Sequence, residues 1–210
     1  DLIVIGGGPA GFMGAITAAE KGLDSVLIFE ATSNTLEKVR ISGGGRCNVT
    51  NACWDPLDLV RNYPRGQSAL LGSFSRFATG DAVSWFSEKG LELLAEEDGR
   101  MFPLSNSSAE VVSCLRKNAK EVGVRCFINS AVKRLEYLEN KGFFVYIKDS
   151  KPLETKRVLI CTGGNPSGRN LASRLGHTIV PPVPSLFSLT LEANPLNDLS
   201  GLALNDVKVQ

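Results

Sequence analysis

The sequence predicts an α/β fold in which a parallel sheet is combined with an antiparallel meander. Two short apolar runs, 1–5 and 25–30, flank a glycine-rich turn and a run of small residues, which is the pattern of a β-α-β unit. A third apolar run, 157–161, follows a segment of alternating apolar and polar residues over 131–156. Apolar runs that alternate with helical patterns are typical of α/β domains.

The first thirty residues predict a strand, a helix and a second strand. The run 1–5 ends at glycine, as a buried parallel strand often does. Pro9 stands where a first-turn proline is tolerated, and the small residues after it continue a helix to Gly22, a natural C-terminal stop. The run 25–30, SVLIFE, predicts the second buried strand.

The middle of the chain has weaker patterns. Residues 31–67 show no clear period and are predicted to be largely loop with a short helix. Asp81 is expected to cap a helix that ends at Gly90. Ser107 and Glu110 have the spacing of a capping box, and the apolar residues that follow predict one face of a helix: Val111, Val112, Leu115, Ala119 and Val122.

The second half of the chain returns to strands. Residues 124–128 predict a strand, and 131–156 predict a small antiparallel meander that turns at Asn140-Lys141-Gly142. The run 157–161 predicts another buried strand, which ends in Thr162-Gly163-Gly164. From Val180 the sequence becomes proline-rich, so a second domain is expected to begin there, although 31 residues are too few for a separate core.

Composition and charge exclude several classes of protein. Hydrophobic residues make up 43% of the chain and charged residues 21%, which is typical of a globular protein. The net charge of +1 gives no electrostatic footprint for nucleic acid or an anionic membrane. Residues 2–19 carry no charge over 18 positions, but five glycines and a proline within them predict strand, turn and helix instead of a membrane span or signal peptide.

The cysteines indicate a reducing compartment. There are five, at positions 47, 53, 114, 126 and 161, without zinc-ligand spacing, and the chain has one histidine. We therefore expect no metal site and predict reduced thiols in the cytoplasm. The chain opens at Asp1 and not at Met, so we expect the natural N-terminus to lie further upstream.

The first chemical motif is Gly6-Gly7-Gly8-Pro9-Ala10-Gly11, between the first predicted strand and helix. Gly6 permits the tight turn, Gly8 removes a side chain where a pyrophosphate lies, and Gly11 lets the helix pack on the strand. Glu30 follows Gly11 by 19 positions, at the end of the second strand. A carboxylate there accepts hydrogen bonds from ribose hydroxyls and repels a 2′-phosphate, which favours FAD or NAD over NADP.

The second motif is the segment 42–51, SGGGRCNVTN. Its three glycines offer successive exposed amide groups, an arrangement that receives anions, and Arg46 adds a cation. The polar residues after it are suited to the edge of a heteroaromatic ring. An ordinary surface loop has a similar composition, so the motif alone leaves both interpretations open.

Together these motifs resemble those of the HI0933-like FAD-dependent flavoproteins, a family also labelled aminoacetone oxidase-like that includes a reductase of bile-acid intermediates. The resemblance covers residues 1–210 and rests on four segments in order: GGGPAG, GRCNVTN, GRMFP and CTGG. It implies a glutathione-reductase-type FAD-binding Rossmann-like domain with an antiparallel β-meander crossover. Residues 1–179 would be the N-terminal part of that domain, and 180–210 the incomplete start of an inserted β-rich substrate domain.

The resemblance also implies which residues contact FAD. The pyrophosphate would lie on Gly6, Gly8, Pro9, Ala10 and Gly11, and the ribose on Glu30. The flavin ring would lie near Ser42, Gly44, Gly45, Arg46, Cys47 and Asn48. Val132 would be near the adenine, and Thr162, Gly163 and Gly164 along the cofactor. The C-terminal glycine-rich segment that closes over the flavin in this family is absent here, so we expect the natural chain to be longer.

Cys47 and Cys53 admit a second interpretation as a redox-active pair. Five residues separate them. On a helix such positions lie about 9 Å apart along the axis and on different faces, beyond the roughly 7 Å limit for a disulfide. A loop could still join them, but two small buried thiols are the expected arrangement.

Three further features are expected to be structural. His177 follows a predicted helix end, where a capping or core histidine is expected. The carboxylate run 96–98 precedes a turn and is expected to be solvated. Phe102-Pro103 is predicted to be a buried anchor, and the role of Arg100 beside it stays open.

The expected function is that of an FAD-dependent oxidoreductase. Bound flavin would move a hydride to or from a small organic substrate, with NAD(P)H as a candidate transient electron donor. The sequence indicates no catalytic side chain and no oligomeric state, and neither nucleic acid nor a membrane is an expected partner. Two alternatives are a thiol–disulfide flavoenzyme that uses Cys47 and Cys53, and a flavin-binding module without catalysis.

Overall fold

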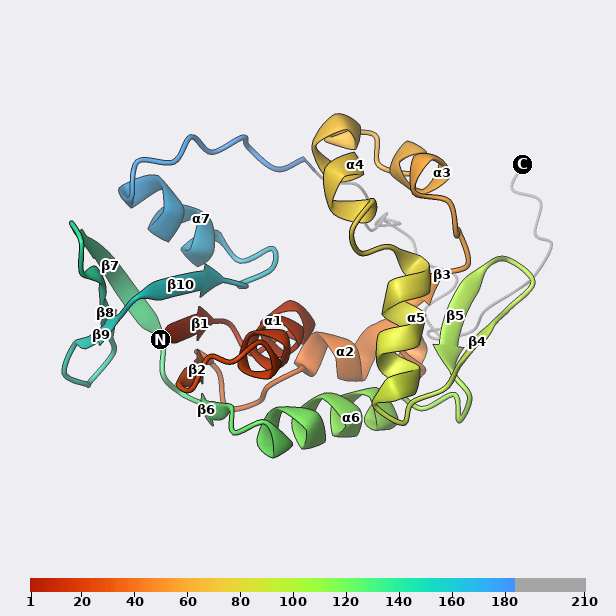
Figure 1. Cartoon of the computed structure of the whole chain (residues 1–210), viewed down its shortest axis with the longest axis horizontal. Coiled ribbons are helices and arrows are strands. Elements are labelled where there is room, and N and C mark those ends of the chain that lie inside the picture. Colours follow the sequence, from red (N-terminus) through yellow and green to blue (C-terminus); the bar gives the residue numbers. More distant parts are fainter. Residues whose placement is uncertain (184–210) are drawn as a thin grey trace, which may run out of the picture. The chain divides into compact units, whose positions relative to one another are not determined.

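The computed structural model describes residues 1–183, of which Asp1–Thr178 belong to one structural unit (Figure 1). Most of the predicted start of a second domain, 184–210, lies outside the described residues. No helix in the described part of the chain is long and apolar enough to cross a membrane.

A four-stranded parallel sheet forms the centre of this unit. Its strand order is β10-β1-β2-β6, with bounds Arg157–Ile160, Leu2–Ile5, Val26–Phe29 and Arg125–Phe127. Ile5 is paired with Phe29 on one side and with Ile160 on the other, so the strands end in register. All four strands were predicted, three of them from apolar runs, and their carboxyl ends meet at one edge of the sheet, where ligands bind in open α/β sheets.

Helices cover one face of the sheet. Helix α1 (Pro9–Glu20) packs on β1 and β2 and contacts α6 (Ser108–Glu121), as Figure 1 shows. Because side chains alternate along a strand, Leu2 and Val4 point to this helical side. They join a buried cluster with Phe12 and Ile16 of α1 and with several residues of α6: Val111, Cys114, Leu115 and Ala119.

The predicted meander covers the opposite face. It consists of β7 (Val132–Leu138), β8 (Gly142–Ile147) and β9 (Leu153–Thr155), paired in that order as antiparallel strands. The alternate residues of the central strands, Ile3, Ile5 and Phe29, pack here against a second cluster of buried residues: Val132, Leu135, Val145, Ile147 and Leu171 of α7 (Pro166–Arg174). The meander is the crossover between β6 and β10, so the predicted fold class is confirmed.

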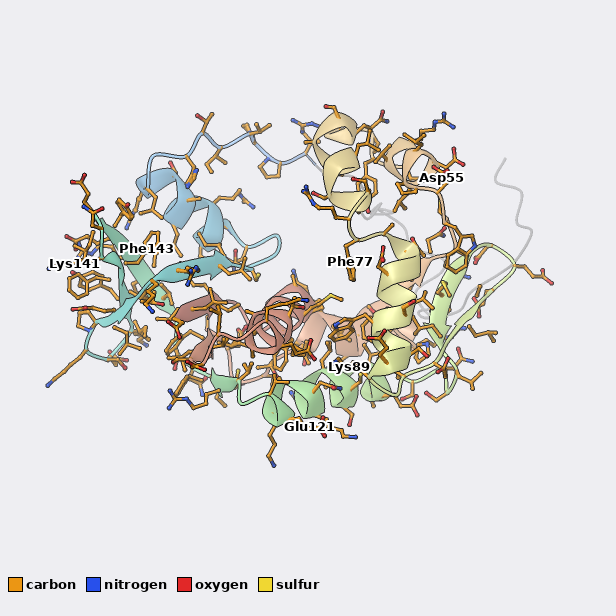
Figure 2. All side chains as sticks on the ribbon, viewed as in Figure 1. Asp55, Phe77, Lys89, Glu121, Lys141 and Phe143 are labelled. Carbon is orange, nitrogen blue, oxygen red and sulfur yellow. The ribbon has the colours of Figure 1, made fainter. Side chains whose placement is uncertain are left out.

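The segment between β2 and α6 holds more regular structure than its sequence predicts. Besides a short 3₁₀ turn at Ser42–Gly45, it contains seven elements: α2 (Glu37–Ile41), β3 (Thr50–Asn51), α3 (Pro56–Arg61), α4 (Gln67–Phe74), α5 (Thr79–Glu88), β4 (Leu93–Ala95) and β5 (Arg100–Pro103). Helix α4 has no buried residue, so it leaves no periodic apolar signal in the sequence. Helix α3 begins after Asp55, labelled in Figure 2, whose carboxylate accepts the Leu57 amide at 2.6 Å.

Two of the predicted caps differ in the structure. Helix α5 starts at Thr79, so Asp81 is its third residue and not its cap; the Asp81 carboxylate accepts the amide of Ala78 at 2.7 Å. Ser107 does precede α6, but its hydroxyl makes no capping bond to that helix. In both cases the helix exists where predicted, and only the geometry of its first turn was wrong.

Candidate cofactor-binding site

The first glycine motif lies where β1, β2 and β10 end together. The Gly6 amide donates to Phe29 O at 2.9 Å, and the Cys161 amide donates to Ile5 O at 2.7 Å. Gly6 has a φ of +109°, and a Cβ atom there would lie 2.4 Å from Cys161 O. Only glycine fits this conformation and this space.

Gly11 and Gly8 differ sharply in their surroundings. A Cβ at Gly11 would lie 2.0 Å from Gly6 O, so helix α1 crosses the turn in direct backbone contact. A Cβ at Gly8 would have no atom within 4 Å. Close packing therefore explains Gly11, whereas the space beside Gly8 is open to a ligand.

The start of α1 presents unsatisfied amide groups to that space. Gly8 is the N-cap residue and supplies no side-chain cap, and Pro9 has no amide hydrogen. The first helical bond runs from Phe12 N to Gly8 O at 3.0 Å; within the described residues the amides of Ala10 and Gly11 donate to no acceptor. Free amides and the positive end of the helix dipole are suited to an anion, and the residues present fit a pyrophosphate.

Glu30 joins the end of β2 to the glycine turn. Its Oε2 accepts the Gly7 amide at 2.7 Å, and its Oε1 accepts the amide and the hydroxyl of Thr32, each at 2.8 Å. A carboxylate offers about four acceptor positions, so capacity for a ribose hydroxyl remains. The sequence predicts only the ribose contact, whereas the structure adds a bond that holds the turn itself.

The second glycine motif forms a tight left-handed turn after α2. Ser42–Gly45 is a short 3₁₀ turn in which all three glycines have positive φ values. A Cβ at Gly43 would lie 3.0 Å from Asn48 N, whereas Cβ atoms at Gly44 and Gly45 would have no neighbour within 4 Å. The motif is thus a built turn whose outer two glycines face open space.

The side chains of Arg46 and Asn48 point to the β4–β5 hairpin. The Arg46 guanidinium forms an ion pair with Glu96 and donates to Asn106 Oδ1, and Asn48 Oδ1 accepts the Met101 amide at 3.2 Å. Glu97 and Asp98 are exposed, as expected for the run 96–98, whereas Glu96 is only partly exposed because the hairpin brings it to Arg46. The Arg46 charge is compensated by this carboxylate, and a contact of Arg46 with a cofactor stays a prediction.

Cys47 and Cys53 are free thiols in the structure, as are the other three cysteines. Cys47 is buried in the cluster beneath α1, and this burial raises the pKa of its thiol above the ordinary value. Cys53 is only partly buried, which differs from the expected pair of buried thiols. A protonated, enclosed Cys47 lacks the lowered pKa that dithiol chemistry needs.

The other residues predicted to contact FAD are Val132 and the segment 162–164, and the structure leaves mainly their backbone accessible. The Val132 side chain is buried against β1 and β2, so only its main chain is free for an adenine. A Cβ at Gly168 of α7 would lie 2.0 Å from the Thr162 hydroxyl, so that hydroxyl packs on α7. Gly163 and Gly164 are exposed, and their backbone remains accessible.

The structure adds one candidate that sequence reasoning missed. The Lys38 ammonium, on α2, lies 3.9 Å from the position of a Cβ at Gly163. A cation at this place complements an anionic ligand on the strand ends. A lysine in a short helix gives no sequence signal for this role, because only the packing of α2 brings it to the loop after β10.

The residues expected to be structural are placed as follows. Phe102 and Pro103 are buried, which confirms the predicted anchor, and Arg100 pairs with Asp98. The His177 side chain is exposed beyond α7 and is not a core residue; its amide donates to Ala172 O at 3.2 Å. In the described part of the chain no group of His, Cys, Asp and Glu could hold a metal ion.

Comparison with known proteins identifies relatives over nearly the whole chain. A model of the HI0933-like protein Rossmann domain matches residues 1–208. A 3-dehydro-bile acid delta(4,6)-reductase of Clostridium scindens is 30% identical and aligns with 98% of this chain and 51% of its own length. A ribosomal RNA dihydrouridine synthase of Haemophilus influenzae is 28% identical, with coverages of 97% and 53%. The chain spans about half the length of these curated relatives.

Solved structures share the fold at lower identity. The 3-ketosteroid-delta4-(5alpha)-dehydrogenase from Rhodococcus jostii is 17% identical, with a TM-score of 0.56 over 76% of this chain and 45% of that one. At this identity the likeness concerns the fold alone. It agrees with the parallel sheet and the meander described above.

Proposed function

Because this chain belongs to the HI0933-like family, we propose that it is the nucleotide-binding part of an FAD-dependent oxidoreductase. The observation that carries the proposal is the space beside Gly8, bordered by the free amides of Ala10 and Gly11. Glu30 at the neighbouring strand end supplies the acceptor for a ribose and disfavours a 2′-phosphate. The five free thiols support a cytoplasmic location.

Each group of residues has one task in this proposal. The Ala10 and Gly11 amides bind the pyrophosphate, Glu30 orients the adenosine, and the exposed backbone of Gly44 and Gly45 meets the flavin ring. Bound FAD would supply the hydride chemistry, while the protein supplies binding, orientation and electrostatics. No side chain of the described residues needs to act as nucleophile.

The relatives' names suggest the direction of the reaction. A delta(4,6)-reductase and a dihydrouridine synthase both saturate a carbon–carbon double bond. In each named substrate that bond is conjugated with a carbonyl group. We therefore propose that the full protein reduces a conjugated double bond of a small molecule, with NAD(P)H as the electron donor.

A second candidate substrate is uridine in RNA, because one relative is named for ribosomal RNA. The net charge of +1 offers no general attraction for a polyanion, which places this candidate second. The decisive experiment starts from the purified full protein, reduced anaerobically with NADH or NADPH. A Δ4-3-oxo steroid or a uridine-containing oligonucleotide is then added, and flavin reoxidation is followed in the visible spectrum.

We expect NADH or NADPH to bleach the flavin absorbance and the steroid to reoxidise the reduced flavin. Reoxidation by the oligonucleotide alone would favour the RNA candidate. A flavin that is reduced by neither NADH nor NADPH would contradict the proposed electron donor. A protein that binds flavin but passes electrons to neither compound would agree better with a non-catalytic module.

Replacement of Glu30 tests the ribose assignment. Glu30→Ala is expected to weaken FAD binding by roughly 1–3 kcal/mol, because ribose hydroxyls lose a charged acceptor and the Gly7 amide loses its partner. The measurement is a titration of flavin-free protein with FAD. Thr32→Val is the matched control, since it removes one bond to the same carboxylate and keeps the charge. Unchanged affinity in Glu30→Ala would refute the assignment.

A further inference from the structure

Two side chains of the second glycine motif, Arg46 and Asn48, contact the β4–β5 hairpin, and Arg46 makes the larger set of contacts. Arg46 Nε and Nη2 donate to Asn106 Oδ1 at 2.9 and 2.7 Å, and Nη2 also pairs with Glu96. The Arg46 guanidinium lies 3.8 Å from the centroid of the Phe102 ring. We call Arg46, Glu96, Asn106 and Phe102 the loop clasp.

The turn has an unusual backbone conformation. Two of the backbone bonds that close it run from Arg46 N to Gly43 O at 3.3 Å and from Cys47 N to Ser42 O at 3.0 Å. Cys47 has a φ of +61°, which is unfavourable for a residue with a side chain. Three glycines with positive φ add conformational freedom that must be lost on folding. The surrounding structure therefore has to hold this conformation.

The loop clasp is suited to that task by its partial burial. The side chains of Arg46 and Glu96 are 35% and 33% exposed, so their ion pair is less solvated than a surface pair. A planar guanidinium bonded on its edge and stacked on its face is fixed in orientation. Phe102 itself is buried and lies 3.1 Å from the position of a Cβ at Gly43.

We propose that Glu96 and Asn106 are positioning residues for flavin binding. They act through Arg46 and hold the amides of Gly44 and Gly45 in the conformation that receives the flavin, without touching it. This inference rests on the proposed function. It assigns a role to Glu96, 50 residues from Arg46 in the sequence, and to Asn106 in the segment between β5 and α6.

The same hairpin contains a matched control. Asp98 pairs with Arg100 at 2.6 Å, and the Arg100 guanidinium lies 5.5 Å from the same Phe102 ring. Asp98 has no bond to the Ser42–Asn48 segment. Arg100 also pairs with Glu96 at 3.5 Å, so Asp98→Asn leaves that pair and every bond of Arg46 in place while it removes a carboxylate charge from the same hairpin.

The experiment compares Glu96→Gln with Asp98→Asn in the full protein. The first readout is amide hydrogen exchange of residues 42–48 in the flavin-free form, with β8 as an internal reference. The second is the Kd for FAD. For Glu96→Gln we expect exchange to accelerate and FAD affinity to fall, each about tenfold, while β8 is unchanged. Asp98→Asn should match the wild type in both.

A double-mutant cycle tests whether Arg46 transmits the effect. Arg46→Gln combined with Glu96→Gln should weaken FAD binding no more than the worse single variant. Equal behaviour of the Glu96 and Asp98 variants, or additive effects in the cycle, would overturn the inference. Failure of the wild type to bind FAD would refute the proposed function instead, and the exchange readout would still decide whether Glu96 holds the loop.

Discussion

Gly8→Val is expected to abolish flavin retention and to leave the fold intact. Gly8 has a φ of −86° and a ψ of −177°, an extended conformation that valine adopts readily. A Cβ there meets no protein atom within 4 Å, so the valine side chain would instead fill the space proposed for the pyrophosphate. The measurement is the ratio of flavin absorbance to protein absorbance after purification.

A thermal melt of the flavin-free proteins supplies the control for this variant. Because no protein atom is displaced, the Tm of flavin-free Gly8→Val should equal that of the flavin-free wild type. Gly8→Ala, with one added methyl group, should retain flavin with reduced affinity. A Gly8→Val protein that stays as yellow as the wild type would show that the pyrophosphate lies elsewhere.

Gly11→Ala is expected to destabilise the protein strongly, by about 3 kcal/mol or more. Alanine is a better helix former than glycine by about 1 kcal/mol, so helix propensity alone predicts the opposite sign. The deciding fact is the distance of 2.0 Å between the new Cβ and Gly6 O. That oxygen belongs to backbone held by the bond from Gly6 N to Phe29 O, so α1 would have to move off the sheet.

A glycine-to-alanine substitution in α4 separates helix propensity from steric clash. Gly72 lies within α4, and a Cβ there meets no atom within 4 Å. Gly72→Ala should therefore stabilise the protein by roughly 0.5–1 kcal/mol. Both variants are compared by chemical denaturation of the flavin-free protein. A Gly11→Ala variant as stable as the wild type would mean that α1 adjusts to the strand without cost.

Local patterns predicted the elements that have a clear period. The apolar runs became β1, β2 and β10, the alternating segment became the meander, and the apolar stripe after Ser107 became the buried face of α6. Helix α4 escaped prediction because it buries no residue. The prediction that Ser107 caps α6 was also wrong. The spacing of a capping box does not decide whether the serine hydroxyl turns toward the helix.

For the candidate site, the sequence by itself determined the first glycine turn and the acid at the end of β2. These follow from steric limits that act within a few residues, because Gly6 needs a positive φ and a β-α-β unit places Glu30 at the neighbouring strand end. Sequence spacing could not predict that the Glu30 carboxylate also binds the Gly7 amide.

Only the tertiary structure decided which charges are paired. Glu96 looks solvated in its own sequence window, yet the hairpin brings it to Arg46, and the packing of α2 brings Lys38 to Gly163. The structure also separates the two thiols that were both expected to be buried, because Cys47 is buried and Cys53 is only partly so. The physical reason is the same in each case: electrostatic contacts and desolvation depend on neighbours in space, which a local sequence pattern does not contain.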